Sequence, residues 1–272
     1  MNVWQNLPSH IDPVFLRVGS FQIRYYSLMY ILCFVVVTLL LIYRIKKEKW
    51  PYTPATVENY FTWALLGVII GARLGYVLFY NLDFYLTYPL QIVWPFDTGG
   101  HFIGIAGMSY HGGLLGAIVS SWLFCRRYRI SFWRFADFVT PAVPLGYAFG
   151  RLGNFLNGEL YGRPTDVPWG MYFPQAPDGQ LRHPSQLYEM LFEGLFLFAV
   201  MWSIRKNPKL RGQMLPLYII GYGTVRFFIE FFRAPDAQIG LLVFHLSLGQ
   251  LLCLTMISLG AGLLLIPKTL PR

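Results

Sequence analysis

FADFVTPAVPLGYAFGRLGNFLNGELYGR, residues 135–163, joins an apolar run to a polar one within a single segment. Residues 135–149 are apolar enough to form most of a membrane-spanning helix. Polar side chains follow at once, beginning with Arg151 and Asn154, and we expect both near or within the hydrocarbon. A charge there costs at least ~2.5–3.5 kcal/mol unless it faces a cavity or a partner. The segment therefore predicts a membrane helix with polar groups in a functional role, although Arg151 alone could also extend to the lipid headgroups.

Composition places the whole chain in the same class. Of 272 residues, 55% are hydrophobic, 18% are aromatic and only 13% are charged, about half the charged fraction of a soluble domain. We predict an all-α, polytopic integral membrane protein that forms a single membrane-embedded domain over residues 1–272. The net charge of +9 does not indicate a nucleic-acid partner, because most basic residues lie in short loops between apolar runs.

Seven apolar segments are long enough, or nearly so, to cross a bilayer. They are residues 25–43, 60–80, 111–125, 135–155, 186–204, 214–232 and 244–266, of which the third is short for a full span. Glycines four residues apart within these segments allow helix backbones to approach closely. We interpret the following as packing positions: Gly67, Gly71, Gly75, Gly146 and Gly150.

The basic residues alternate between the connections. Four basic residues follow each of the first, third and fifth segments, whereas residues 81–110 before His111 contain no lysine or arginine. By the positive-inside rule, the N-terminus is outside (periplasmic) and the C-terminus is cytoplasmic. The two long outer loops, about residues 81–110 and 157–185, are rich in Pro, Gly, Trp and Tyr, and we expect them to form a small periplasmic cap.

This topology places the intramembrane polar residues in the outer half of the bilayer. Arg73 and Arg226 lie in outward-running helices, and Glu189 opens an inward-running one. Helical spacing sets Tyr222, Arg226, Glu230 and Arg233 on one face, and Glu189 and Glu193 on another. We expect these faces to converge on a cavity in the outer leaflet. For the Arg226–Glu230 pair alone, a purely structural ion pair is the alternative.

Arginine outnumbers lysine inside the predicted bilayer, which indicates an anionic ligand that bears phosphate. A guanidinium stays charged and binds oxyanions through two parallel hydrogen bonds. A phospholipid is the phosphate compound closest at hand. No HExxH-like cluster of metal ligands occurs in the sequence, and we expect no metal or organic cofactor.

Several motifs in order along the chain carry a resemblance to a known family. They are GRLGNFLNGELYGR at residues 150–163, YYSLMY at 25–30, GARLGY at 71–76, MSYHGG at 108–113, RHPSQLYE at 182–189 and GYGTVR at 221–226, the last continuing to Glu230 and Arg233. Together they resemble the prolipoprotein diacylglyceryl transferases, which are bacterial inner-membrane enzymes. The outer loops, residues 81–107 and 161–181, follow no pattern of that family.

The resemblance implies the first step of bacterial lipoprotein maturation. A diacylglyceryl group would move from phosphatidylglycerol to the lipobox cysteine thiol of a prolipoprotein, with glycerol 1-phosphate released. The chain would be a multi-pass protein of the inner membrane, with its active site toward the outer leaflet. Its partners would be phosphatidylglycerol, the prolipoprotein signal peptide and the lipid bilayer.

The resemblance also implies residue roles. Arg151 and Arg226 match the two arginines that bind and turn over phosphatidylglycerol. We expect catalytic roles for Arg151, Arg226, His111 and Tyr222, and substrate contacts from Arg151, Tyr26, Asn154, Glu159, Gly162, Glu189, Glu230, Arg233 and Arg73.

The sequence does not decide which group acts as the general base for the substrate thiol. A thiol with a pKa of about 8.5 must lose its proton before it attacks. His111 is the obvious candidate by its ordinary pKa, yet a histidine beside two glycines at a helix start is equally a structural residue. Tyr222, Glu230 or the field of the two arginines are the other options.

Two other classes compete with this function. A transporter of organic phosphates or phospholipid headgroups would also use intramembrane arginines, but transporters commonly show internal repeats and a site at the midplane. No repeat is visible here. A membrane scaffold without catalysis is disfavoured by the number of intramembrane polar residues.

Overall fold

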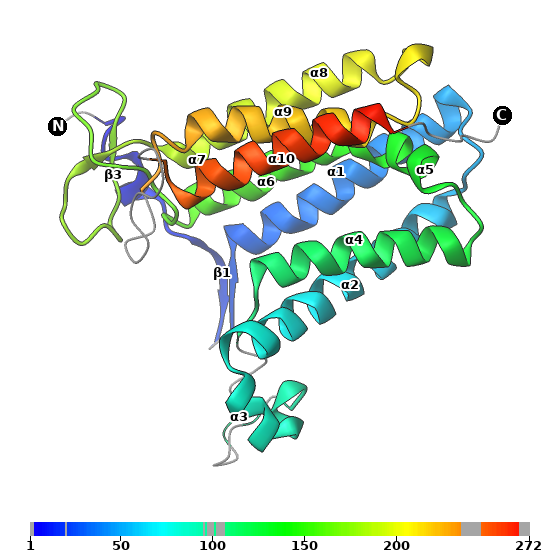
Figure 1. Cartoon of the computed structure of the whole chain (residues 1–272). Coiled ribbons are helices and arrows are strands. Elements are labelled where there is room, and N and C mark those ends of the chain that lie inside the picture. Colours follow the sequence, from blue (N-terminus) through cyan, green and yellow to red (C-terminus); the bar gives the residue numbers. More distant parts are fainter. Residues whose placement is uncertain are drawn as a thin grey trace. The chain divides into compact units, whose positions relative to one another are not determined.

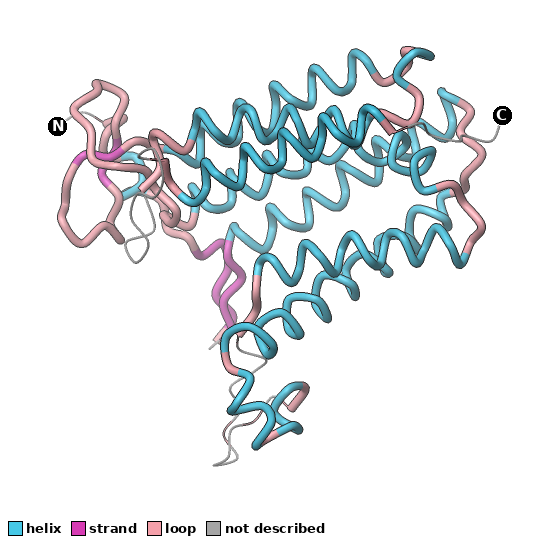
Figure 2. Tube along the Cα trace, in the orientation of Figure 1, coloured by secondary structure: helices cyan, strands magenta, loops and turns pink. Residues whose placement is uncertain are grey.

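The computed structural model describes residues 3–19, 21–94, 96, 101, 107–234 and 246–266. The chain divides into two compact units: Met1–Lys49 with Ala136–Arg272, and Trp50–Phe135. The single domain expected over residues 1–272 stays a prediction. Helices make up most of both units (Figures 1 and 2).

The first unit is a helical bundle with two short hairpins. Its elements are η1 (Leu7–His10), β1 (Val14–Val18), β2 (Phe21–Arg24), α1 (Tyr25–Glu48), η3 (Thr140–Ala142), α6 (Val143–Leu156), β3 (Met171–Tyr172), β4 (Leu181–Arg182), α7 (Ser185–Tyr188), the π-helical η4 (Glu189–Phe196), α8 (Leu197–Ile204), η5 (Pro208–Leu210), α9 (Met214–Ile229) and α10 (Leu248–Leu265). Helix α6 packs against α1 and η4, and α9 packs against α10. α5 (Phe132–Val139) spans the boundary between the units.

A buried arginine fixes the C-terminal end of α1. Arg44 is 1% exposed, and its Nη1 donates to the carbonyl oxygens of Asp137 (2.8 Å) and Phe138 (2.5 Å). Glu48 accepts from Arg44 Nε and from Arg205 Nε, at 2.7 and 2.8 Å. These contacts satisfy the charges at the bundle end, and they tie α1 to the segment before α6 and to the end of α8.

The loop between α6 and α7 is ordered. β3 and β4 pair in antiparallel fashion, with Met171 opposite Arg182. Phe155, Met171 and Phe173 form a small apolar core, to which Leu7 and Ile11 of the N-terminal segment contribute. The aromatic content of residues 157–185 thus forms a packed structure, although a cap shared with residues 81–110 stays a prediction.

The second unit is centred on two helices. It contains α2 (Pro54–Tyr80), α3 (Leu82–Thr87), η2 (Pro89–Ile92) and α4 (Tyr110–Arg127). α2 begins at a capping box in which Thr53 and Thr56 bond each other's backbone N–H, and Ser109 caps α4. Such caps satisfy amide groups that a helix start leaves without partners.

Glycines bring α2 and α4 together. A Cβ at Gly75 would lie 2.7 Å from Gly112 Cα, and one at Gly71 would lie 2.7 Å from Gly116 Cα. The predicted packing role is confirmed for Gly67, Gly71 and Gly75, and also for Gly146, which faces Cys33 and Val37 of α1. It is wrong for Gly150, where a Cβ would meet no described atom within 4 Å, because this glycine faces no neighbouring helix there.

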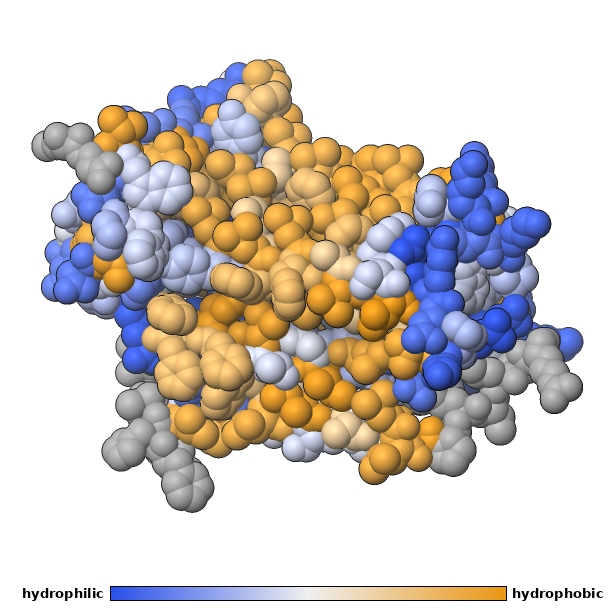
Figure 3. All heavy atoms as spheres, turned by 90° about the horizontal axis from the view of Figure 1, so that it is seen from above, coloured by the Kyte–Doolittle hydropathy of each residue, from blue (hydrophilic) through white to orange (hydrophobic). Residues whose placement is uncertain are grey.

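Four described helices are long and apolar enough to cross a membrane: Tyr25–Glu48, Pro54–Tyr80, Ser185–Ile204 and Leu248–Leu265. The helix Met214–Ile229 is apolar but shorter. In the helices visible in Figure 3, apolar residues occupy the middle and hydrophilic residues gather toward the ends. These features describe a helical membrane protein.

Several element bounds differ from the predicted segments by a few residues, since α1 continues to Glu48 and α2 begins at Pro54. Three segments differ in other ways. The predicted helix 135–155 is interrupted by the turn Thr140–Ala142, because Pro141 cannot donate a helical hydrogen bond. The predicted helix 186–204 contains the π-helical stretch Glu189–Phe196. The segment 214–232 is helical only as far as Ile229, and residues 244 and 245 of the last segment lie outside the described residues.

Candidate active site

Glu189 lies at the centre of an ion-pair network in the first unit. Its Oε2 is 2.8 Å from Arg151 Nε of α6, and its Oε1 is 2.9 Å from Arg226 Nη1 of α9. Arg233, just beyond α9, approaches the same Oε1 at 3.5 Å. Because the Glu189 side chain is 1% exposed, its charge depends on these partners.

The π-helical stretch positions two carboxylates rather than one. Glu189 and Glu193 are both fully buried, and Arg226 Nη1 lies 3.6 Å from Glu193 Oε1. Close approach to α6 is possible because position 194 is glycine, where a Cβ would lie 2.6 Å from Ala148 Cβ. π-Helical turns of this kind occur frequently at functional sites.

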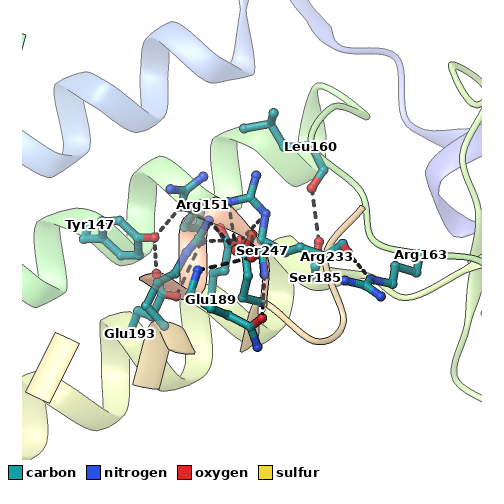
Figure 4. A network of polar contacts seen from close by, with 12 residues as sticks. Tyr147, Arg151, Leu160, Arg163, Ser185, Glu189, Glu193, Arg233 and Ser247 are labelled. Atoms are coloured by element: carbon teal, nitrogen blue, oxygen red, sulfur yellow. Dashed lines mark hydrogen bonds and ion pairs between the residues drawn. The ribbon is translucent and has the colours of Figure 1, made fainter. Parts of the chain in front are cut away.

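Tyr147 connects Arg151 to Glu193. Its hydroxyl accepts a hydrogen bond from Arg151 Nε at 2.7 Å and donates one to Glu193 Oε2 (Figure 4). The Arg151 guanidinium also lies over the Tyr147 ring, 4.8 Å from its centre, and the Tyr222 ring meets Tyr147 edge-on at 5.6 Å. Tyr222 therefore packs beside the network through a ring contact with Tyr147.

Asn154 extends the network toward the loop that follows α6. Its Oδ1 accepts from Arg151 Nη1 at 3.3 Å, and its Nδ2 donates to Glu159 Oε1 at 2.9 Å. The Glu159 carbonyl accepts from the buried Gln186 side chain at 2.6 Å. The motif residues Arg151, Asn154 and Glu159 thus form one hydrogen-bonded chain.

Glu230 joins α9 to α10. Its Oε2 is 3.2 Å from Arg226 Nη2 and 4.0 Å from Arg233 Nη1, and its Oε1 accepts from Ser247 Oγ at 3.2 Å. Gly249 lies close against this carboxylate, and a Cβ there would lie 2.5 Å from Glu230 Oε1, so a larger residue would displace the Glu230 side chain. The predicted Arg226–Glu230 pair is present, but Glu189 is the nearer partner of Arg226.

Gly162 has a backbone role. Its N–H donates to the His183 carbonyl at 2.9 Å, it bridges Arg233, and a Cβ there would lie 2.8 Å from His183 Cβ. The neighbouring Arg163 donates through Nε to the Arg233 carbonyl at 2.6 Å. These bonds fix the segment that carries Arg233, and a contact between Gly162 and substrate stays a prediction.

Tyr26 of α1 packs on α6 near this network. A Cβ at Gly153 would lie 3.1 Å from the Tyr26 ring, and the Tyr26 hydroxyl is 3.0 Å from that of Tyr30. The absence of a side chain at Gly153, between Arg151 and Asn154 in α6, thus makes room for the Tyr26 ring.

His111 and Arg73 belong to the second unit. His111 is an exposed residue in the first turn of α4. Arg73 donates to the backbone carbonyls of Gln91 (2.6 Å), Ile92 (2.7 Å) and Gly107 (3.1 Å). These contacts hold the connection that follows α2, so roles of Arg73 and His111 toward substrate stay predictions.

Two titratable groups of the loop between α6 and α7 have shifted pKa values. Burial lowers the pKa of His183 from 6.5, partly opposed by the charge of Asp166. The hydrogen bond from Arg182 lowers the pKa of Asp178. His183 Nδ1 lies 3.1 Å from the Tyr188 hydroxyl, and this contact attaches the loop to α7. Among the described residues, no group of three His, Cys, Asp or Glu side chains is arranged to hold a metal ion.

The site therefore presents guanidiniums from α6, α9 and the segment after α9, each held by carboxylates. A family model described as prolipoprotein diacylglyceryl transferase matches residues 13–266. The chain belongs to the prolipoprotein diacylglyceryl transferase family.

Relatives match over nearly their whole length. A phosphatidylglycerol–prolipoprotein diacylglyceryl transferase of Chlorobaculum tepidum is 51% identical over 268 residues, covering 97% of this chain and 93% of the relative. Proteins of the same name from Bordetella parapertussis and Wolinella succinogenes are 48% and 47% identical, covering 94% and 93% of this chain and 95% and 92% of their own lengths. The expected family is thereby confirmed.

Within this transferase family fold, the structure brings together Arg151, Asn154, Glu159, Glu189, Arg226, Glu230 and Arg233, all of them predicted site residues. Two members of the network were not predicted as site residues, Tyr147 and Glu193. Each lies four residues from a predicted one, Tyr147 before Arg151 and Glu193 after Glu189. That spacing was the available signal, since it places them on the same helix face.

Proposed function

We propose that this chain transfers the diacylglyceryl group of phosphatidylglycerol to the lipobox cysteine thiol of a prolipoprotein. A C–S bond forms at a glycerol carbon, the C–O bond to phosphate breaks, and glycerol 1-phosphate leaves with the electron pair. The names of the relatives supply the substrate classes, and the arginine cluster supplies a means of stabilising the leaving phosphate.

One observation carries the proposal. The side chains of Arg151, Arg226 and Arg233 keep 18%, 13% and 21% of their surface exposed, whereas Glu189 behind them keeps 1%. Buried carboxylates thus hold three guanidiniums in place while leaving part of each accessible. Preorganised cations of this kind stabilise the negative charge that grows on a departing phosphate, and guanidiniums suit its oxygens through paired hydrogen bonds.

The remaining predicted residues support this chemistry. Arg151 and Arg226 would bind the phosphate, and Asn154, Glu159 and Glu230 would orient them. Tyr26, Tyr222, Gly162 and Arg73 would shape the lipid and peptide sites, with His111 as one candidate for the base. This displacement requires no metal or organic cofactor, so the arginines would stabilise the charge on the leaving group.

A direct assay tests the function. Purified protein is incubated with phosphatidylglycerol and a peptide that carries a lipobox cysteine, and mass spectrometry looks for a diacylglyceryl increment on the peptide. A peptide with serine in place of cysteine is the control, and Arg226→Ala the inactive variant. Phosphatidylglycerol binding without any increment under conditions that support turnover by the Chlorobaculum tepidum relative would reject the proposal.

The proposed topology has seven spans, formed by α1, α2, α4, α5 with α6, α7 with α8, α9 and α10, in the inner membrane. The ends of α1 and α4, which carry Lys46 and Arg127, and the loop that carries Lys206 would be cytoplasmic, and the loops that carry Trp94 and Trp169 periplasmic. The active site would then face the outer leaflet. Single cysteines at the two tryptophan positions, in a cysteine-free background, should react with a membrane-impermeant reagent from outside. Labelling at Lys206 but not at Trp169 would reverse the assignment.

A further inference from the structure

A tyrosine and a glutamate form a proton path behind Arg151. We propose that Glu193, through the hydroxyl of Tyr147, accepts the proton of the attacking cysteine thiol and later returns it to the departing phosphate. This inference rests on the proposed function, and it assigns the base that the reaction requires to two residues outside the predicted site.

The geometry of the Tyr147 hydroxyl supports a relay. The hydroxyl accepts from Arg151 Nε at 2.7 Å while its own proton is directed at Glu193 Oε2 (Figure 4). In the displacement, the sulfur attacks the glycerol carbon that bears the leaving oxygen of a phosphate held by Arg151. The Tyr147 oxygen, bonded directly to the same guanidinium, is therefore a hydroxyl within the neighbourhood of the thiol.

Glu193 retains capacity for a proton. Its side chain is completely buried, and its Oε1, like Oε2 of Glu189 and of Glu230, accepts no hydrogen bond from any described residue. What distinguishes Glu193 is distance, because its Oε1 lies 3.6 Å from Arg226, whereas the closest ion-pair distances are 2.8 Å for Glu189 and 3.2 Å for Glu230. Of these three carboxylates, Glu193 is the one held least closely by guanidiniums.

The charges of the network favour this choice. Arg151, Arg226 and Arg233 carry three positive charges, and Glu189, Glu193 and Glu230 carry three negative ones. Glu159, joined to Arg151 through Asn154, adds a fourth negative charge, and a bound phosphodiester would add a fifth, in surroundings of low dielectric constant where excess charge is costly. This excess of negative charge favours transfer of the thiol proton to a carboxylate, and Glu193 is the paired carboxylate that guanidiniums hold least closely.

Titratable groups from every neighbouring element face Glu193. They are Tyr147 and Arg151 of α6, Glu189 of η4, Arg226 of α9 and Cys253 of α10, with Tyr222 of α9 against the Tyr147 ring. Tyr147 joins Glu193 to Arg151 by hydrogen bonds through a group that can both give and take a proton. The path from the thiol therefore runs through Tyr147.

The step balances in protons and electrons. The S–H bond breaks, its proton moves to the Tyr147 oxygen, and the Tyr147 proton moves to Glu193, leaving a thiolate. The thiolate forms the C–S bond as the C–O bond breaks, and the departing glycerol 1-phosphate gains one negative charge. The proton held by Glu193 returns through Tyr147 to this phosphate, which restores the starting state.

The test compares Glu193→Gln and Tyr147→Phe with the wild-type protein. Wild-type turnover of the lipobox peptide is established first, so that a failure of the proposed function is recognised separately. Both variants should lose about 100-fold in kcat with the cysteine peptide. Phosphatidylglycerol affinity should be retained or raised, because Glu193→Gln removes a negative charge beside the phosphate site.

A second substrate separates proton transfer from a merely structural role. A selenol is more acidic than a thiol, so a peptide with selenocysteine at the lipobox position needs no base. Both variants should turn over this peptide at a rate near that of the wild type, and their activity with cysteine should rise with pH. Glu193→Asp should retain partial activity, because it keeps a carboxylate.

The controls make the same chemical changes at exposed positions. Glu58→Gln and Tyr128→Phe should leave both substrates unaffected. Equal loss with the cysteine and the selenocysteine peptide in folded variants would overturn the proposal, as would wild-type turnover by Glu193→Gln. If Glu193→Gln does not fold, Tyr147→Phe alone decides by the same criteria.

Discussion

The carboxylate of Glu189 lies between two guanidiniums from different helices, 2.8 Å from Arg151 Nε and 2.9 Å from Arg226 Nη1. Replacement of Glu189 by Gln preserves the shape but leaves both arginines without this counter-ion. We expect a loss of stability of about 3–5 kcal/mol together with a loss of turnover, measured by thermal unfolding in detergent and by the peptide assay. Glu58→Gln is the matched control, and unchanged stability of Glu189→Gln would contradict the central role of this carboxylate.

Lysine substitutions at Arg151 and Arg226 test whether the fork of the guanidinium matters or only its charge. A lysine keeps the charge but binds an oxyanion through a single point. We expect Arg151→Lys and Arg226→Lys each to lose about 100-fold in kcat. Arg17→Lys, at an exposed ion pair with Asp12, should have no effect. Near-normal turnover of both site variants would show that charge alone suffices.

Glu230→Gln should give a milder defect than Arg226→Ala. The amide keeps the shape and a bond to Ser247, and Arg226 retains Glu189 as its nearer partner. Turnover should fall while phosphatidylglycerol affinity changes less. Equal loss in the two variants, with the protein folded, would instead indicate a direct chemical role for Glu230.

His111→Gln separates a histidine base from the Tyr147–Glu193 path. Glutamine keeps hydrogen bonding but cannot take a proton in this pH range. We expect substantial turnover and an unchanged pH profile, because the proton path proposed above does not use His111. A loss of about 100-fold that the selenocysteine peptide restores would assign the base to His111 instead.

The lowered pKa of His183 predicts that the stability of the folded protein depends on pH. Burial lowers its pKa below 6.5 in the folded protein, so the unfolded chain binds a proton more readily than the folded one. The contribution is fully present above pH 6.5 and is lost as the pH falls through that value. Thermal unfolding should show a drop in stability on acidification that is smaller in His183→Gln, with exposed His10→Gln as control. An identical pH dependence in His183→Gln and the wild type would contradict this assignment.

The sequence predicted the helical class and much of the site. Apolar run length and helical spacing are local properties, so the helices of both units fall close to the expected segments. Spacing also placed Arg226 and Glu230 on one face. The interruption at Pro141 and the π-helical turn after Tyr188 were missed, because an apolar segment of membrane length masks a local change in helix geometry.

What the sequence by itself determined was therefore the membrane class, the order of the motifs, the family resemblance and the polar faces of individual helices. The tertiary structure alone decided that Glu189 bridges Arg151 and Arg226, that Glu193 receives the hydroxyl of Tyr147, and that Gly150 contacts no neighbouring helix. The reason is physical. Hydrophobic length and spacing act within one helix, whereas the partner of a buried charge depends on which helix lies beside it, and close contacts such as Gly194 against Ala148 set that neighbour.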